Sequence, residues 1–160
     1  VLACSDSRVP VEAIFSQGAG DLFVVRVAGN VISPVPLGSM EFAVEELEVP
    51  LVLVMGHTGC GAVQAALASS ASGGAEPEME GENLGALLDP ILDVLGRKAG
   101  SRLAKGALGP DDAVRLNVHG ACEDLLAGSA VLSDRVRGGR LQIVGAIYDL
   151  KTGRVEFLGT

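Results

Sequence analysis

Three residues that can ligate a soft metal ion directly follow two apolar runs of the chain. Residues 51–55 read L-V-L-V-M and lead into G-H-T-G-C-G-A-V, which carries His57 and Cys60, while residues 1–3 lead into C-S-D-S-R, which opens on Cys4. Loops at the carboxyl ends of strands assemble sites in an open parallel sheet, so we expect these side chains to converge. Two thiolates and one imidazole suit zinc with a fourth, open position, which is typical of a catalytic site.

Two charged residues follow Cys4 closely enough to act with it. Asp6 lies two residues further on, within reach to accept a hydrogen bond from a zinc-bound hydroxide and to aim it at a substrate. Arg8 lies two residues beyond Asp6, so its side chain should point to the same side. Its guanidinium can donate two parallel hydrogen bonds to the Asp6 carboxylate, which keeps the carboxylate ionised. The alternative is that Asp6 and Arg8 form only an ion pair that stabilises the loop.

The spacing H-x-x-C occurs twice, and the two copies differ in context. Alone, His57 and Cys60 are also typical of a polar loop residue beside a buried thiol, but the strand and C-x-D-x-R segment that hold Cys4 favour a site. His119 and Cys122 have the same spacing inside a predicted helix, and no further Cys or His remains to complete a second set. We expect a buried free thiol beside a partly exposed histidine there.

Three segments resemble a known family. C-S-D-S-R-V-P, F-V-V-R-V-A-G-N and G-H-T-G-C-G-A-V are similar, in this order and spacing, to the signature segments of the β-class carbonic anhydrases, with a weaker echo over residues 140–158. The resemblance implies reversible hydration of carbon dioxide to bicarbonate and a proton with one zinc per chain. It assigns Cys4, His57 and Cys60 as ligands and Asp6 with Arg8 as the catalytic dyad.

The same resemblance implies a small, mostly apolar substrate pocket. Phe23, Ala28 and Phe42 would form a wall suited to an uncharged substrate, with core packing as the alternative for Phe42. Gly59 and Gly61 would let the backbone approach closely, because glycine has no side chain to obstruct it.

Arg26 is a charge inside an otherwise apolar run and therefore needs a partner. That partner is either a carboxylate at the strand end or a group of the active-site region. Family members that bind inhibitory bicarbonate combine such an arginine and a tyrosine with a tryptophan three residues before the first cysteine. This chain has Arg26 and Tyr148 at matching positions, but Val1 stands where the tryptophan would be. We therefore expect that pocket to be incomplete and Arg8 to hold Asp6 off the metal.

Hydrophobic patterning predicts an α/β fold in one domain spanning residues 1–160. We expect a central, mostly parallel β-sheet flanked by helices, with a C-terminal strand pair around Gly153. The predicted strands are residues 1–3, 21–28, 51–55, 141–148 and 154–158. The predicted helices are residues 9–15, 37–47, 84–95 and 110–126, and the alanine-rich segment after Cys60 reads as the start of another. Residues 33–36 should be extended, Pro90 should kink or break its helix, and residues 69–83 should form a mobile acidic loop.

Composition excludes some classes of function. The net charge is −8 and the 12 basic residues are scattered, so a nucleic-acid partner is not expected. No apolar run approaches about 18 residues, which argues against a membrane span. Three cysteines, an odd number, favour metal or free thiols in a reducing, cytoplasmic compartment. A hydrophobic fraction of 48% in so acidic a chain, together with the family resemblance, favours a homodimer or homotetramer.

The first residue, Val1, falls inside an expected strand. We therefore expect a natural N-terminal arm to precede this segment, along with a glutamine that many family members carry upstream of the first cysteine. This leaves open a targeting segment.

Two other uses of the same site remain open. One is a hydrolase of a carbon dioxide analogue, carbonyl sulfide or carbon disulfide, which would need a different access channel. The other is a catalytically inactive zinc-binding homologue in which Asp6 closes the metal as a fourth ligand.

Overall fold

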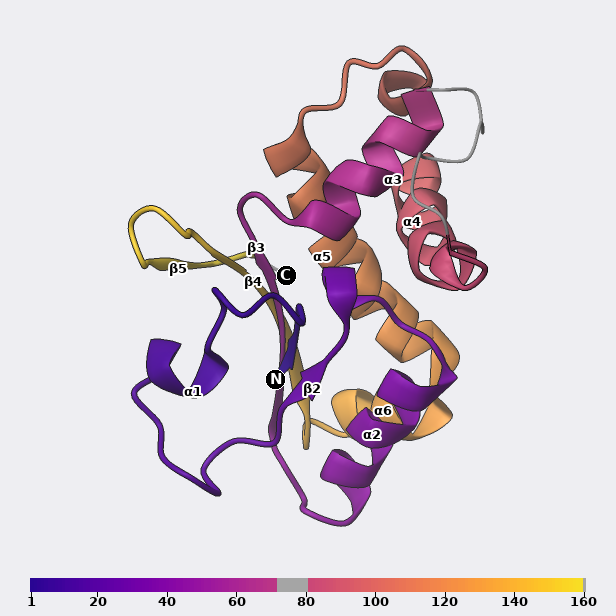
Figure 1. Cartoon of the computed structure of the whole chain (residues 1–160). Helices are drawn as coiled ribbons and strands as arrows, with labels where there is room; N and C mark the ends of the chain where they lie inside the picture. Colours follow the sequence, from indigo (N-terminus) through magenta and orange to yellow (C-terminus); the bar gives the residue numbers. More distant parts are fainter. Residues whose placement is uncertain (72–80, 160) are drawn as a thin grey trace.

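A five-stranded sheet forms the centre of the molecule (Figure 1). The structure, a computed structural model, describes residues 1–71 and 81–159. The strands lie in the order β2-β1-β3-β4-β5; all neighbours pair in parallel except β4 and β5, which are antiparallel. The predicted fold class, a mostly parallel sheet with helices and a C-terminal strand pair, is therefore confirmed. In chain order the elements are β1 (Leu2–Ala3), α1 (Val11–Ile14), β2 (Val25–Arg26), the 3-10 turn η1 (Ala28–Asn30), α2 (Pro34–Glu45), β3 (Leu51–His57), α3 (Gly61–Ala71), α4 (Leu84–Ala104), α5 (Pro110–Gly128), α6 (Ala130–Arg137), β4 (Gln142–Tyr148) and β5 (Val155–Phe157).

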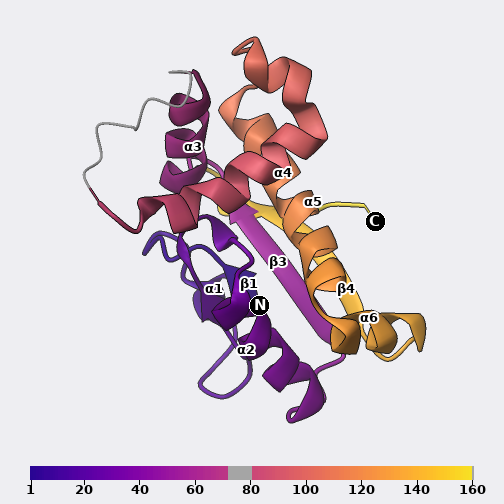
Figure 2. The ribbon, with the colours of Figure 1, turned by 90° about the vertical axis from the view of Figure 1, so that its right-hand side faces the viewer.

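Helices cover the two faces of the sheet unequally (Figures 1 and 2). The short α1 lies on one face, whereas α2, α3, α5 and α6 lie on the other, with α4 packed outside on α3 and α5. Successive side chains of β3 point to opposite faces, so Val52 and Val54 enter the larger core and Leu53 and Met55 the smaller one. Because both faces are covered, β3 is apolar from Leu51 to Met55, as expected for a central parallel strand.

Helix α5 approaches the sheet closely because two strand residues have no side chain. A Cβ atom at Gly56 would lie 2.6 Å from a Val118 methyl carbon, and one at Gly145 would lie 2.9 Å from the other. Any larger residue at either position would push α5 away from β3 or β4.

The register of the sheet brings the ends of β1 and β3 together. Leu2 pairs with Val54 and Ala3 with Met55. Cys4, which follows β1, therefore lies beside the end of β3, close to His57. Both strands run in the same direction, and the loops after them share one edge of the sheet, as the sequence predicts.

Several element limits differ from those predicted. The strand expected over residues 21–28 is only Val25–Arg26, because its neighbour β1 offers only Leu2 and Ala3 for pairing. Residues 34–36 are not extended; α2 begins at Pro34, since the first helical turn needs no backbone N–H donors and tolerates proline. Helix α4 continues through Pro90 and loses helical geometry at Ala99 instead.

Residues 69–71, the first three of the predicted acidic loop over residues 69–83, are helical instead. Helix α3 continues to Ala71, and the prediction for residues 72–80 lies outside the described part of the chain. Among the residues that the structure describes, no helix is both long and apolar enough to cross a bilayer.

Candidate metal site

Cys4, His57 and Cys60 converge at the carboxyl edge of β1 and β3. One ligand atom from each lies within 4.8 Å of the other two, and all three residues are buried. Cys4 follows β1, His57 is the last residue of β3, and Cys60 directly precedes α3. The predicted convergence of the three side chains is confirmed.

The imidazole of His57 is oriented for metal binding. Its Nδ1 atom lies 3.0 Å from the carbonyl oxygen of Thr58, which makes Nδ1–H the donor and leaves the lone pair on Nε2. Nε2 is buried and has no hydrogen-bond partner among residues 1–71 and 81–159. A buried polar atom without a partner is unfavourable, and a metal ion between the two sulfurs would satisfy it.

The two thiols form an electrostatically coupled pair. The hydrogen bond from Cys60 lowers the pKa of Cys4, and the same bond raises the pKa of Cys60, so the pair carries one negative charge near neutrality. Backbone N–H groups add support: that of Gly29 donates to Cys4 Sγ at 3.4 Å. A divalent cation would displace the remaining proton, and this donor set of two sulfurs and one imidazole fits zinc.

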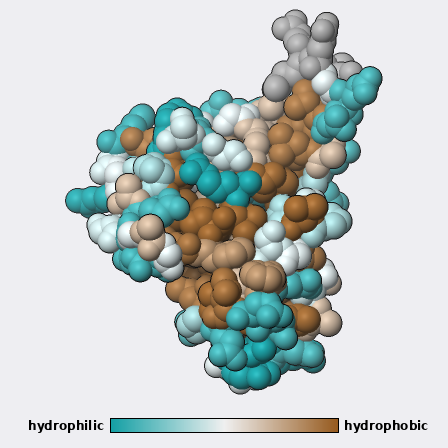
Figure 3. Space-filling view, turned by 60° about the horizontal axis from the view of Figure 1, so that its bottom comes forward, coloured by the Kyte–Doolittle hydropathy of each residue, from teal (hydrophilic) through white to brown (hydrophobic). Residues whose placement is uncertain are grey.

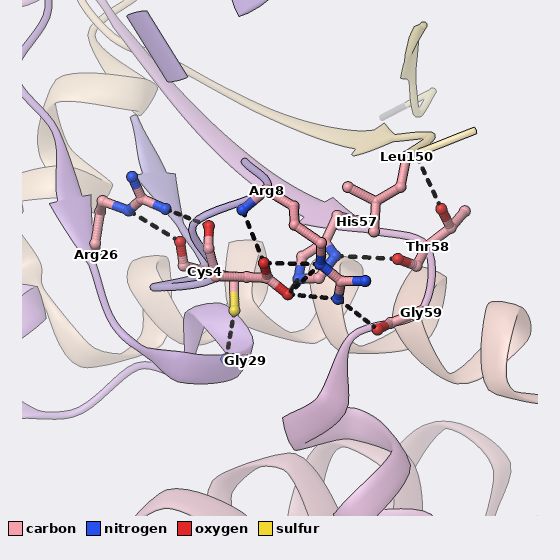
Figure 4. A network of polar contacts seen from close by, with 9 residues as sticks. Cys4, Arg8, Arg26, Gly29, His57, Thr58, Gly59 and Leu150 are labelled. Carbon is pink, nitrogen blue, oxygen red and sulfur yellow. Dashed lines mark hydrogen bonds and ion pairs between the residues drawn. The ribbon is translucent and has the colours of Figure 1, made fainter. Parts of the chain in front are cut away.

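Asp6 and Arg8 form a tightly bonded pair beside this cluster (Figure 4). The Arg8 guanidinium donates from Nε and Nη2 to the carboxylate, at 3.0 and 2.6 Å, and its backbone N–H adds a bond of 2.9 Å. These bonds hold the pKa of Asp6 well below its usual range. Nη2 also reaches the Gly59 carbonyl at 3.4 Å, so Arg8 links the two site loops. Asp6 Oδ2 lies 3.9 Å from His57 Nε2, which places the ionised carboxylate at the rim of the metal cluster.

Arg26 belongs to the site region, and no carboxylate in the described part of the chain pairs with it. Its Nε donates to the carbonyl of Cys4 at 3.0 Å and its Nη2 to the carbonyl of Asp6 at 2.6 Å (Figure 4). Of the two partners considered from sequence, the structure supports the active-site region. Arg26 fixes the backbone of the loop that carries a metal ligand and the dyad carboxylate.

The five residues predicted to bind substrate are only partly brought together. Ala28 opens η1 beside the Gly29 N–H, and Gly59 and Gly61 flank Cys60, so these three adjoin the cluster. Phe23 does not, because it precedes β2 and lines a hollow with Leu51 and Val52, where β3 begins.

Phe42 also lies away from the cluster. Its ring centroid is 6.2 Å from that of Phe23, and its side chain is 53% exposed. Core packing, the alternative considered for Phe42, is therefore wrong. Within one chain these two rings do not line the metal cluster.

His119 and Cys122 contribute no second site. Among the described residues, only Cys4, His57 and Cys60 bring three such ligand atoms together. His119 is exposed, and Cys122 is a free, half-buried thiol whose pKa is raised to about 11 by burial. This agrees with the predicted lone thiol, although Cys122 is less buried and His119 more exposed than expected.

Two residues of the site were not found from the sequence. The carbonyl oxygen of Thr58 accepts the hydrogen bond from His57 Nδ1–H, and its hydroxyl accepts one from the Leu150 N–H at 3.0 Å. Asn117 on α5 is 2% exposed and donates to the Gly29 carbonyl at 2.8 Å. The sequence feature that could have identified Asn117 is its amide side chain within the apolar stripe of a predicted helix, between Val114 and Val118.

Comparisons with known proteins agree with this geometry. A family model described as carbonic anhydrase matches residues 1–155. The chain is 43% identical over 157 residues to carbonic anhydrase 2 of Mycobacterium tuberculosis, covering 96% of this chain and 70% of that protein, and 34% identical to a carbonic anhydrase of Pseudomonas aeruginosa, covering 98% and 71%. Among solved structures, a tetrameric β-carbonic anhydrase of Sordaria macrospora superposes with a TM-score of 0.81 at 26% identity, covering 99% of this chain and 79% of that one.

Proposed function

Because this chain belongs to the β-carbonic anhydrase family, we propose that it converts carbon dioxide and water to bicarbonate and a proton, reversibly, with one zinc ion at Cys4, His57 and Cys60. The observation that carries this proposal is the unpartnered, buried Nε2 of His57 facing two thiols, with an ionised carboxylate at the rim. Zinc in such a site acidifies water and thereby supplies a nucleophile near neutral pH.

In this proposal Asp6 orients the attacking water and does not store its proton. Arg8 holds the pKa of Asp6 well below its usual range, so the carboxylate accepts a hydrogen bond and remains ionised. Oδ2 accepts the Arg8 Nη2–H at 2.6 Å and shares the Nε–H with Oδ1, at 3.2 Å against 3.0 Å, so a further hydrogen bond to Oδ2 would use the lone pair that only this weaker contact occupies. The proton released by the reaction must therefore leave to solvent or buffer.

Arg8 and Arg26 both keep this acceptor in place. Arg8 grips the carboxylate, and Arg26 holds the backbone carbonyls on either side of Ser5. We infer that Arg8 also opposes a direct Asp6–metal bond, since coordination would require the carboxylate to leave a bidentate partner.

Stopped-flow measurement of carbon dioxide hydration on the zinc-loaded protein tests the proposal. We expect turnover by the parent, and an Asp6→Asn variant that keeps its zinc but loses about 10²-fold or more in kcat. Turnover of Asp6→Asn at the parent rate would refute the acceptor role. An assay with carbonyl sulfide and carbon disulfide in parallel decides the substrate, and full zinc without turnover on any of the three would indicate an inactive homologue.

We further propose that copies of the chain assemble as a homodimer or homotetramer. The Sordaria macrospora relative is tetrameric. In this chain an apolar hollow of about 570 Å³ opens where β3 begins, and Phe23, Met40 and Phe157 are among its lining residues. Self-association would cover this surface.

A further inference from the structure

Asn117 is a buried amide in a stripe that is otherwise apolar. On α5 it lies between Val114 and Val118, which pack on the sheet, and one turn before Ala121. Its side chain is 2% exposed, and Nδ2 donates to the carbonyl oxygen of Gly29 at 2.8 Å. Burial of an amide is unfavourable unless it is hydrogen-bonded, so this contact determines how the side chain is placed.

Gly29 is the residue through which Asn117 can act on the metal site. The Gly29 N–H donates to Cys4 Sγ at 3.4 Å (Figure 4), while its carbonyl accepts from Asn117. Its φ of +67° is left-handed, and a Cβ atom there would lie 2.8 Å from Ile91 Cδ1, so glycine is required. The orientation of this single residue therefore sets the direction of the N–H that meets the sulfur.

We propose that Asn117 is a positioning residue for the metal ligand Cys4, acting through Gly29, an inference that rests on the proposed zinc site. With the carbonyl of Gly29 held by Asn117, the Gly29 N–H is fixed toward the sulfur, which is thereby aimed at His57 and Cys60. Partners outside the ligand shell that orient a ligand typically change metal affinity by about 10- to 100-fold when removed. Asn117 follows Cys4 by 113 positions (117 − 4) in the sequence, yet two hydrogen bonds connect them.

A purely structural role for Asn117 makes a different prediction. If the amide only satisfies the Gly29 carbonyl, its loss destabilises the fold and leaves metal affinity equal to that of any equally destabilised variant. Leu125 provides the matched control, because it is fully buried on the same helix, two turns further from Gly29.

The test compares Asn117→Leu, Leu125→Ala and the parent for zinc affinity by competition with a chromophoric chelator. We expect Asn117→Leu to bind zinc about 10- to 100-fold more weakly than the parent, and Leu125→Ala to bind within about twofold of it. With cobalt(II) in place of zinc, the thiolate-to-cobalt charge-transfer band should shift in Asn117→Leu only. If Asn117→Leu does not fold, Asn117→Ala removes the same donor without adding bulk and is measured in the same way.

Parent-like zinc affinity in the Asn117 variant would overturn the inference, as would an equal loss in Leu125→Ala. Failure of the parent itself to bind one zinc would refute the proposed zinc site, and this inference with it. That outcome is visible in the parent alone, so the two failures are distinguishable.

Discussion

A different local interaction holds each of the three predicted ligands in place. The Cys4 sulfur accepts the N–H of Gly29, His57 is oriented by the Thr58 carbonyl, and Cys60 sits at the amino end of α3. The positive end of a helix dipole favours a thiolate, so α3 supports the charge that Cys60 must carry when it binds metal. A substitution that removes the thiolate should therefore remove most of the affinity.

We expect Cys60→Ser to lose its zinc, because a hydroxyl is a poor substitute for a thiolate at this metal. Elemental analysis after gel filtration should give one zinc per chain for the parent and far less for the variant. Cys122→Ser is the control and should keep one zinc, since Cys122 lies outside the cluster. Full zinc in Cys60→Ser, or two tightly bound zincs in the parent, would contradict the single three-ligand site.

The Asp6–Arg8 pair makes a prediction about pH. The folded pKa of Asp6 lies below its unfolded value, so the stability that the pair contributes is present above about pH 4 and is lost only as pH falls through the lower, folded pKa. Asp6 therefore does not titrate in the working range. Two thiolates should acidify water less than three imidazoles do, which puts the relevant ionisation above about 7.

Activity should accordingly rise with pH through one ionisation, which a pH series of kcat measures. Cooperative loss of activity below pH ~8, together with a crystal structure in which Asp6 coordinates the metal, would show that Arg8 does not hold the carboxylate away. In that case Asp6 would reach the metal although Val1 stands where a tryptophan would complete the bicarbonate pocket.

The residues of the metal cluster could be predicted from the sequence, because they lie at or just after the ends of two apolar strands and the ligand types are chemically specific. Asn117 and Thr58 could not, since their roles depend on contacts between distant segments. Phe23 shows the same limit: its residue type suits an apolar pocket, but only the folded chain reveals that it lines a hollow with Val52, where β3 begins.

At the scale of elements, long periodic segments were predictable and short ones were not. Helix α5 begins at Pro110 as predicted from proline and two acids in its first turn, and β4 and β5 flank a turn at Gly153 with φ of +70°. The length of β2 depends on the two residues that β1 offers it. Continuation of α4 through Pro90 depends on packing of Leu88 and Ile91 into the core, which local propensity does not report.

Two helix glycines predict opposite effects of the same substitution. A Cβ atom at Gly120 of α5 would lie 2.3 Å from a Val94 methyl carbon of α4, whereas one at Gly96 would meet nothing within 4 Å. We expect Gly120→Ala to lower the free energy of unfolding by about 1–3 kcal/mol through overpacking, and Gly96→Ala to raise it by about 0.5–1 kcal/mol. Chemical denaturation measures both, and equal effects would mean that α4 and α5 are not in close contact.

At the scale of the whole molecule, one face carries a broad apolar area of a kind that monomeric proteins rarely expose to water. Figure 3 shows a broad hydrophobic area on the face brought forward from the lower end of Figure 1. The apolar hollow where β3 begins has Phe157 and Leu51 in its lining, and these residues are 62% and 49% exposed. Contiguous apolar surface of this kind typically marks an interaction site.

A charge placed on this surface should prevent assembly without unfolding the chain. Phe157→Glu introduces a carboxylate that a second copy would have to bury unpaired, which is strongly unfavourable, whereas in a single chain the side chain is mostly exposed to water. We expect the parent to sediment as a dimer or tetramer at micromolar concentration and Phe157→Glu to shift toward the monomer, with an unchanged circular dichroism spectrum. Ala107→Glu adds the same charge at an exposed position between α4 and α5 and should leave the oligomer intact. A monomeric parent would refute self-association, and an unaltered oligomer in Phe157→Glu would place the interface on another face of the molecule.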